Sequence, residues 1–399
     1  MSVQINIDKI SALLLSALMI FMSFNNNVML KKFGLLSLLF FLIFALIVYS
    51  VFQLKINFNQ KVNSTLLIFY LLFFIFLSTY IIGFLRFPDF AGFTNTVQLT
   101  LLFFLVLFIS NTKWEDFYLK LFGDFVATFL VLIFIFWILK SFPKNFAAHM
   151  TNPNAFGAYT FSISFFLLVR VIIEENKIKK TIYTIIAFMA LVLLLSTNSR
   201  SVLIAVFIIF LVYLSWNNII KKKLIYYSFF SFVIFLMFCF IYYYPRLYEY
   251  PNIFNVVNQV SAYFGKTFYS GRELIWKEII DKISEHWIIG LGAGTNTLTL
   301  LGQTIGTHNL YLQLLIQVGT IGIFILILMF FSLWKIYRKL YISFRNTKES
   351  KIIRLSASFL VGIMFHQMFE VTLTQNNLSI GIIQWFSILL PLSFIKMKS

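Results

Sequence analysis

Twelve long apolar runs divide this chain of 399 residues, and they constrain its fold more than any other feature of the sequence. An α-helix needs about 20 mostly apolar residues to cross a bilayer. The composition agrees, because only 12% of the residues are charged, against about 25% in soluble domains. We therefore expect an all-α polytopic membrane protein in which residues 1–399 form one transmembrane domain. The expected spans are 10–23, 33–54, 65–85, 97–110, 122–139, 156–173, 181–196, 201–216, 224–244, 308–334, 355–373 and 378–395.

The distribution of basic residues predicts the orientation of these spans. With the N-terminus placed inside, 21 of the 32 Lys and Arg residues fall on the inside, and basic residues concentrate on the cytoplasmic side of membrane proteins. We therefore expect both termini in the cytoplasm and a large extracytoplasmic loop subdomain at 245–307. The net charge of +18 has the same explanation and does not indicate nucleic-acid binding.

The 245–307 loop contains Ser270-Gly-Arg-Glu273 at the start of a helix-forming stretch. Ser270 and Glu273 have the spacing of a capping box, and Trp276 begins the apolar face of an amphipathic helix that we expect at the membrane surface. Arg272 would lie in the first turn, where free N–H groups and the helix dipole favour phosphate. The alternative is an arginine that only contacts lipid head groups.

Three other predicted helix starts on the outside carry candidate residues. Arg200 follows capping residues in a short turn, with snorkelling toward lipid phosphate as the alternative. His308 opens the tenth span and could act as a general base, although a single histidine is often structural. Asn154 begins the sixth span. Because the helix starts face one surface with their positive dipole ends, we expect a basic pocket there for an anionic, pyrophosphate-containing substrate.

The eleventh predicted span contains two ionisable residues, His366 and Glu370. Their separation of four would place them on one helical face. Ionisable groups within a span usually face a cavity or a partner, so we expect Glu370 near the outer pocket. The sequence has no further histidine at ligand spacing and no Asp-x-Asp pair, and it therefore predicts neither a metal site nor a cofactor.

The order and sidedness of these motifs resemble the O-antigen ligase and Wzy-type polymerase family of bacterial envelope polysaccharide synthesis. The resemblance covers about 190–330 and rests on Ser199-Arg200, Ser270-Gly-Arg272 with Trp276, Gly290-Leu-Gly-Ala-Gly294, His308-Asn309-Leu-Tyr-Leu-Gln313 and Gly319-Thr-Ile-Gly322. It implies a metal-independent, inverting glycosyl transfer at the outer face of the bacterial cytoplasmic membrane. The implied donor is an undecaprenyl-pyrophosphate-linked oligosaccharide.

The resemblance also implies roles for single residues. Arg200 and Arg272 would bind the pyrophosphate, and His308 would be the catalytic base that acts on the acceptor hydroxyl. Further candidates for substrate binding are Asn154, Asn309, His366 and Glu370.

The residues after His308 favour a polymerase over a ligase. Ligases of this family often have an acidic residue after the His-Asn pair, whereas this chain continues Leu310-Tyr-Leu-Gln313. A polymerase would make capsule, O-antigen or exopolysaccharide and would work with a flippase and a chain-length regulator. A ligase would transfer the glycan to the lipid A core.

A flippase or another transporter is the alternative from a different class, since twelve spans also suit transporters. Transporters are typically built from internal repeats and broken helices. The chain shows no repeat and almost no proline within its predicted spans, which argues against a transporter.

Overall fold

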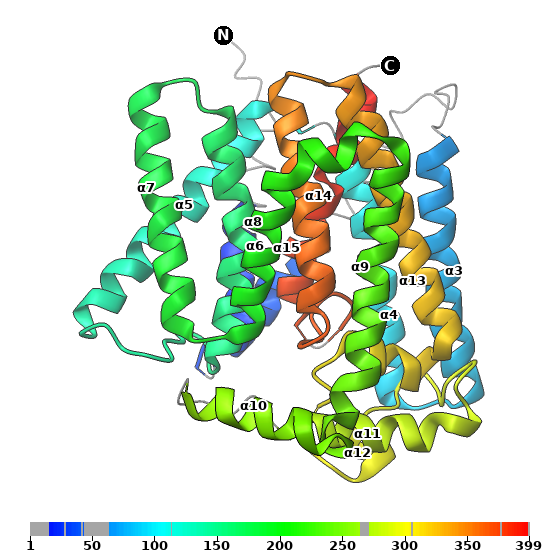
Figure 1. Cartoon of the computed structure of the whole chain (residues 1–399). Helices are drawn as coiled ribbons and strands as arrows, with labels where there is room; N and C mark the ends of the chain where they lie inside the picture. Colours follow the sequence, from blue (N-terminus) through cyan, green and yellow to red (C-terminus); the bar gives the residue numbers. More distant parts are fainter. Residues whose placement is uncertain are drawn as a thin grey trace.

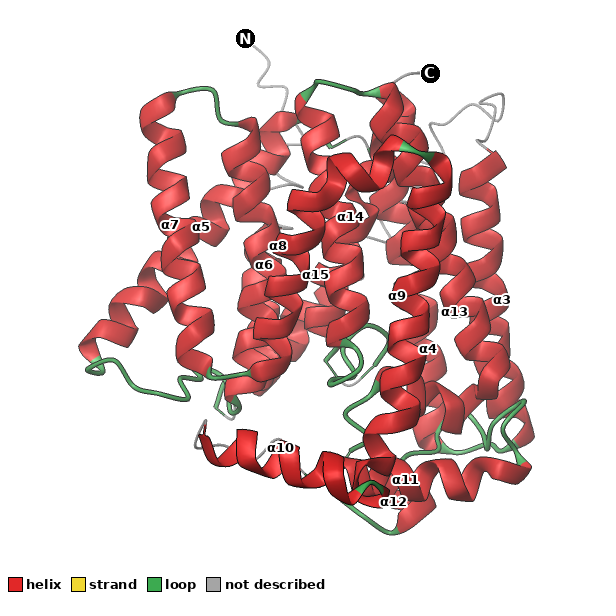
Figure 2. Ribbon diagram, viewed as in Figure 1, coloured by secondary structure: helices red, strands yellow, loops and turns green. Residues whose placement is uncertain are grey.

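The fold is a bundle of long α-helices (Figures 1 and 2). The computed structural model describes residues 16–27, 29–40, 43, 64–112, 114–263, 271–304, 306–375 and 377–397. Within these residues there are helices and loops but no β-strand. The chain is therefore an all-α, multi-pass membrane protein, as its apolar runs predict.

Nine helical segments in the described part of the chain are long and apolar enough to cross a membrane. Their helices are α3 (Ser64–Arg86), α4 (Phe90–Asn111), α5 (Asp116–Leu139), α6 (Pro153–Ile173), α7 (Lys177–Thr197), α8 (Arg200–Lys221), α9 (Lys223–Tyr243), α13 (Leu310–Ser343) and α15 (Leu378–Leu389). A tenth long helix, α14 (Lys348–His366), packs among them. These ten match the predicted spans from 65–85 onward, whereas predicted spans 10–23 and 33–54 extend beyond the described residues.

Successive helices alternate in direction, so their connections gather at two opposite faces of the bundle (Figure 1). One face carries the short connections after α6, α8 and α13. The other, which we call the loop face, carries residues 140–152, 198–199, 244–263, 271–304 and 306–309. Three shorter helices lie across the loop face, namely α10 (Pro251–Tyr263), α11 (Arg272–Lys282) and α12 (Thr297–Leu301).

Helices α6 and α15 form the centre of the bundle. Nearly every residue of α15 is buried, and so is most of α6. Helices α7 and α9 lie at the rim and expose large apolar side chains such as Phe188 and Phe235. Apolar side chains on the outside are stable when the surrounding solvent is lipid, which agrees with a membrane-embedded bundle.

Helix α13 is broken at Gly319, whose φ of 68° and ψ of −167° lie in a region that only glycine readily adopts. A Cβ atom there would lie 2.1 Å from the Ile288 carbonyl oxygen. The break separates backbone groups that would bond to each other in a continuous helix. Loop residues satisfy all four of them, in the bonds Thr320 N to Trp287 O (2.8 Å), Ile321 N to Ile288 O (3.3 Å), Leu291 N to Ile316 O (2.7 Å) and Gly292 N to Gln317 O (3.1 Å).

The predicted amphipathic helix is α11, and it begins at Arg272. Ser270 of the predicted capping box lies outside the described residues, but Glu273 accepts a hydrogen bond from the Gly271 N–H at 3.0 Å. The start of its apolar face is covered by the protein itself. Trp276 and Ile279 of that face are buried against Leu312 of α13, because the first turns of α13 turn toward α11 at the break.

Candidate functional site

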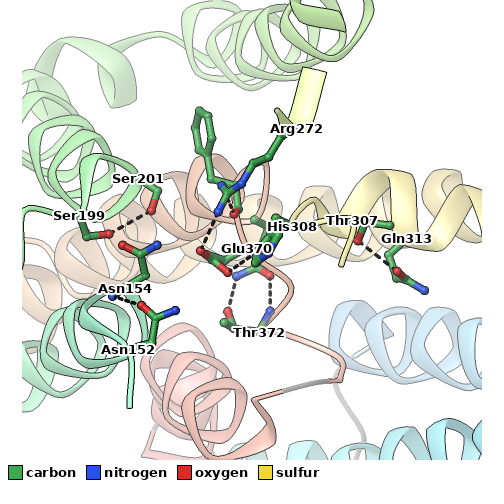
Figure 3. Close-up of polar contacts among 12 residues, drawn as sticks. Asn152, Asn154, Ser199, Ser201, Arg272, Thr307, His308, Gln313, Glu370 and Thr372 are labelled. Atoms are coloured by element: carbon green, nitrogen blue, oxygen red, sulfur yellow. Dashed lines mark hydrogen bonds and ion pairs between the residues drawn. The ribbon is translucent and has the colours of Figure 1, made fainter. Parts of the chain in front are cut away.

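Three of the candidate side chains, which come from separate segments, meet at the loop face (Figure 3). The two carboxylate oxygens of Glu370 each contact one of the others. Oε2 lies 3.2 Å from His308 Nδ1, and Oε1 lies 3.5 Å from Arg272 Nη2. Arg272 Nη1 also donates to the main-chain oxygen of Phe369 at 2.9 Å. Glu370 therefore joins the start of α11 to the start of α13.

His308 is held in an unusual backbone conformation directly before α13. Its φ is 46°, in the left-handed region that non-glycine residues seldom occupy. Both neighbours are anchored. The Thr307 carbonyl accepts from Trp276 Nε1 at 2.8 Å, and Asn309 caps α13 by accepting from the Leu312 N–H at 3.1 Å. These contacts direct the His308 ring toward Glu370.

A chain of buried amides supports the same segment. Thr307 Oγ1 donates to Gln313 Oε1 at 3.0 Å, and Gln313 and Gln317 both donate to the Thr295 carbonyl, at 2.9 and 3.3 Å. Sequence reasoning missed this network. Its signal was present, because Gln313 and Gln317 are polar residues one turn apart within an apolar span, and such residues face the protein interior.

Glu370 is in a turn and not in a helix. Helix α14 ends at His366, so the prediction that His366 and Glu370 share one helical face is wrong. The chain leaves the helix because Gln367 side-chain bonds replace the next turn of backbone bonds. His366 is fully buried next to the Phe161 ring, and neither of its ring nitrogens has a hydrogen-bond partner among the described residues.

The charges around Glu370 keep it ionised. Burial raises its pKa, but the hydrogen bond with His308 and the positive charge of Arg272 lower it further, so that the net shift is downward. An ionised carboxylate only accepts hydrogen bonds. His308 Nδ1 is therefore placed to donate to Glu370, and in a neutral ring with this tautomer Nε2 is the acceptor. The His308 side chain is 35% exposed, so the ring is partly accessible from outside.

The remaining predicted residues, Arg200 and Asn154, lie at the same face. Arg200 is exposed and begins α8. Asn154 lies in the first turn of α6, and Figure 3 shows it beside Ser199 and Ser201, next to the Arg272–Glu370 pair. A Cβ on Gly157 would lie 3.4 Å from Ser199 Cβ, so the starts of α6 and α8 are closely packed.

Asn309 is a predicted substrate-binding residue at the start of α13. Asn309 is buried, uses Oδ1 as a helix cap, and has an Nδ2 without a partner in the described part of the chain. It is therefore bound to α13 and not directed into the open site.

Across the described ranges, no three His, Cys, Asp or Glu side chains are grouped as metal ligands would be.

The central part of the chain is similar to a known protein family. Residues 185–327 match the family model described as O-Antigen ligase. The predicted resemblance to the O-antigen ligase family is thereby confirmed. The matched segment contains Arg200, Arg272 and His308, whereas Glu370 follows it.

The chain is also similar to the ComP-specific O-oligosaccharyltransferase of Acinetobacter baylyi. The two are 25% identical over 255 residues, which cover 59% of this chain and 43% of that protein. The chain thus spans less than half the length of this curated relative.

Proposed function

We propose that this protein is a glycosyltransferase that polymerises undecaprenyl-pyrophosphate-linked oligosaccharide units into capsule, O-antigen or exopolysaccharide. The reaction would take place at the extracytoplasmic face of the bacterial inner membrane, with both termini in the cytoplasm and residues 245–307 as an outer subdomain. The observation that carries the proposal is the contact of His308, Glu370 and Arg272 at the loop face. The family match to residues 185–327 supports it.

The cluster contains the groups that such a transfer needs. The acceptor sugar hydroxyl is a poor nucleophile at neutral pH, so His308 Nε2 takes its proton as the oxygen attacks the anomeric carbon. Glu370 keeps the ring oriented and stabilises the imidazolium that forms. The bond from the anomeric carbon to the pyrophosphate oxygen breaks at the same time, and a single displacement of this kind inverts the anomeric configuration.

Arginine would stabilise the departing pyrophosphate. Arg272 uses two of its nitrogens for Phe369 and Glu370, and a guanidinium has five N–H donors, so further donors remain for a phosphate oxygen. Arg200 would be the second phosphate ligand, at the positive end of α8. No metal ion is required by this chemistry, because the two arginines supply the positive charge.

A ligase is the second candidate function. It is favoured by the description of the matching family model as O-Antigen ligase. The two functions share the donor and the base and differ in the acceptor, which is another repeat unit for a polymerase and the lipid A core for a ligase.

A transporter is less well supported, although α13 is a broken helix. In transporters, the free backbone groups of a broken helix bind substrate or ions. At Gly319, loop residues 287–292 occupy those groups, so the break offers no ligand site of that type.

The deciding experiment uses purified protein and lipid-linked repeat units in the presence of EDTA, with products separated on a gel. A polymerase yields a ladder of long polymer without another acceptor. A ligase yields product only when lipid A core is added. Activity that vanishes in EDTA and returns with a divalent metal would contradict the metal-independent mechanism.

A further inference from the structure

The turn that carries Glu370 is built around the side chain of Gln367. Gln367 is fully buried at the end of α14. Its Oε1 accepts from the backbone N–H groups of Thr372 at 3.1 Å and Leu373 at 3.2 Å, while its Nε2 donates to Thr372 Oγ1 at 2.7 Å. One side chain therefore closes residues 367–373 into a fixed turn, with Glu370 at its middle.

The backbone of Gln367 also holds the segment that contains His308. Its carbonyl oxygen accepts from the Leu310 N–H at 2.8 Å, and Leu310 is two residues after His308. Gln367 is thus bonded to both chain segments whose side chains form the His308–Glu370 contact. Its position sets the distance between them.

The turn is further anchored to α15, the most buried helix. Gln384 Oε1 accepts from Gln367 Nε2 at 3.2 Å and from Thr372 Oγ1 at 2.9 Å. Gln384 is itself fully buried. Because buried amides without partners are costly, the three residues keep one arrangement, and the turn cannot rotate without breaking several bonds.

We propose that Gln367 is a positioning residue for glycosyl transfer, which holds the Glu370 carboxylate against His308 Nδ1 without touching substrate. The inference rests on the proposed role of His308 as the base. Its physical basis is that catalysis is sensitive to displacements of about 1 Å, and Gln367 is the group through which the two partners are tied together.

The test compares kcat and KM of purified variants. We expect Gln367→Met to lower kcat by about 10–100-fold, the size found for groups that orient metal-bound histidines, with KM within about twofold because the pyrophosphate ligands are unchanged. Gln384→Met should lower kcat less, because Gln367 Oε1 still accepts from the backbone N–H groups of Thr372 and Leu373. The matched control is Thr374→Val, a buried residue of the same loop whose Oγ1 has no partner among the described residues, and its kcat should stay near that of the wild type.

A double-mutant cycle with Glu370→Gln separates positioning from general damage. If Gln367 acts through Glu370, the double variant is no slower than Glu370→Gln alone. A full further loss in the double variant, or an equal loss in Thr374→Val, would overturn the proposal. If Gln367→Met does not fold, the same comparison is made with Gln384→Met.

A readout without activity keeps this inference distinct from the proposed function. A cryo-EM structure of Gln367→Met in nanodiscs should show Glu370 moved away from His308, and an unchanged contact would overturn the positioning role. Loss of the contact together with full transfer activity in His308→Gln would instead uphold Gln367 as the group that holds Glu370 and refute His308 as the base.

Discussion

Glu370 determines how the neighbouring residues His308 and Arg272 can act. Its carboxylate contacts His308 Nδ1 and one edge of the Arg272 guanidinium. In the proposed mechanism, these contacts align a base and a phosphate ligand before substrate arrives. Each can be tested by a substitution of its own.

Replacing His308 removes the proposed base. Proton transfer of this kind contributes about 10²–10⁴-fold, so His308→Ala should lose that factor in polymer formation and accumulate single repeat units, with normal expression and donor binding. The control is His286→Ala, an exposed histidine outside the cluster, which should remain active. Long polymer from His308→Ala would contradict the proposal.

Replacing Arg272 or Arg200 tests the pyrophosphate site. A hydrogen bond to a charged group is worth about 1.5–3 kcal/mol, so Arg272→Ala and Arg200→Ala should each lower the rate by one to two orders of magnitude or more. Lysine at either position should restore activity only in part, because it lacks the bidentate fork. Half-buried Arg246, whose guanidinium lies over the Tyr242 ring, provides the control as Arg246→Ala. Full activity in both alanine variants of the predicted ligands would exclude this site.

At the element scale, α13 combines two helices that the sequence presents as one. Leu310 to Val318 forms part of the loop face and packs under α11, while the residues after Gly319 cross the bundle. The apolar pattern does not reveal the break, because both halves are hydrophobic. The conformation of Gly319 depends on residues 287–292, which are distant in sequence.

Substitution of Gly319 should be costly for two separate reasons. Gly319→Ala meets the Ile288 carbonyl and also adopts a strained backbone, which alone costs about 1–3 kcal/mol. Gly302→Ala is the matched control, since Gly302 has a φ of 70° but open space around it. We expect a larger drop in the thermal unfolding midpoint for Gly319→Ala, and equal drops would show that the clash with Ile288 is relieved without cost.

Sequence patterns report only local features, and this decides which parts of the site could be predicted. Arg272 and His308 were found because capping patterns and helix starts are local features. The pairing of Glu370 with both of them could not be found, because it depends on α14 ending at His366, and no glycine or proline marks that end. The side chain of Gln367 takes the place of the helical bonds there, but in the sequence nothing distinguishes Gln367 from other polar residues within a span.

At the scale of the whole molecule, the helices sort their connections into two unlike faces. Lys177 and Lys221 lie at the face opposite the loop face, as the charge pattern predicts for residues on one side of a membrane. The order of the long described helices was also predictable, because each needs only a run of apolar residues. The ion pair of buried Arg170 with Asp124 was not, since it joins α6 to α5.

Reporter fusions test which face lies outside the cell membrane. Alkaline phosphatase is active only after export, so fusions within 245–307 should be active and fusions within 335–354 inactive. Matched fusions to a reporter that works only in the cytoplasm should give the opposite pattern. If alkaline phosphatase activity appears instead at 335–354, the His308 cluster faces the cytoplasm. That result would exclude the proposed extracytoplasmic reaction.

The break at Gly319 also matches the protein to the thickness of a bilayer. A continuous helix of 34 residues would be about 51 Å long, well beyond the roughly 30 Å of a hydrocarbon core. Residues 320–343 alone measure about 36 Å, which fits that thickness with modest tilt. We therefore expect the first turns of α13, before Gly319, to lie in the headgroup region, with His308 at their outer end.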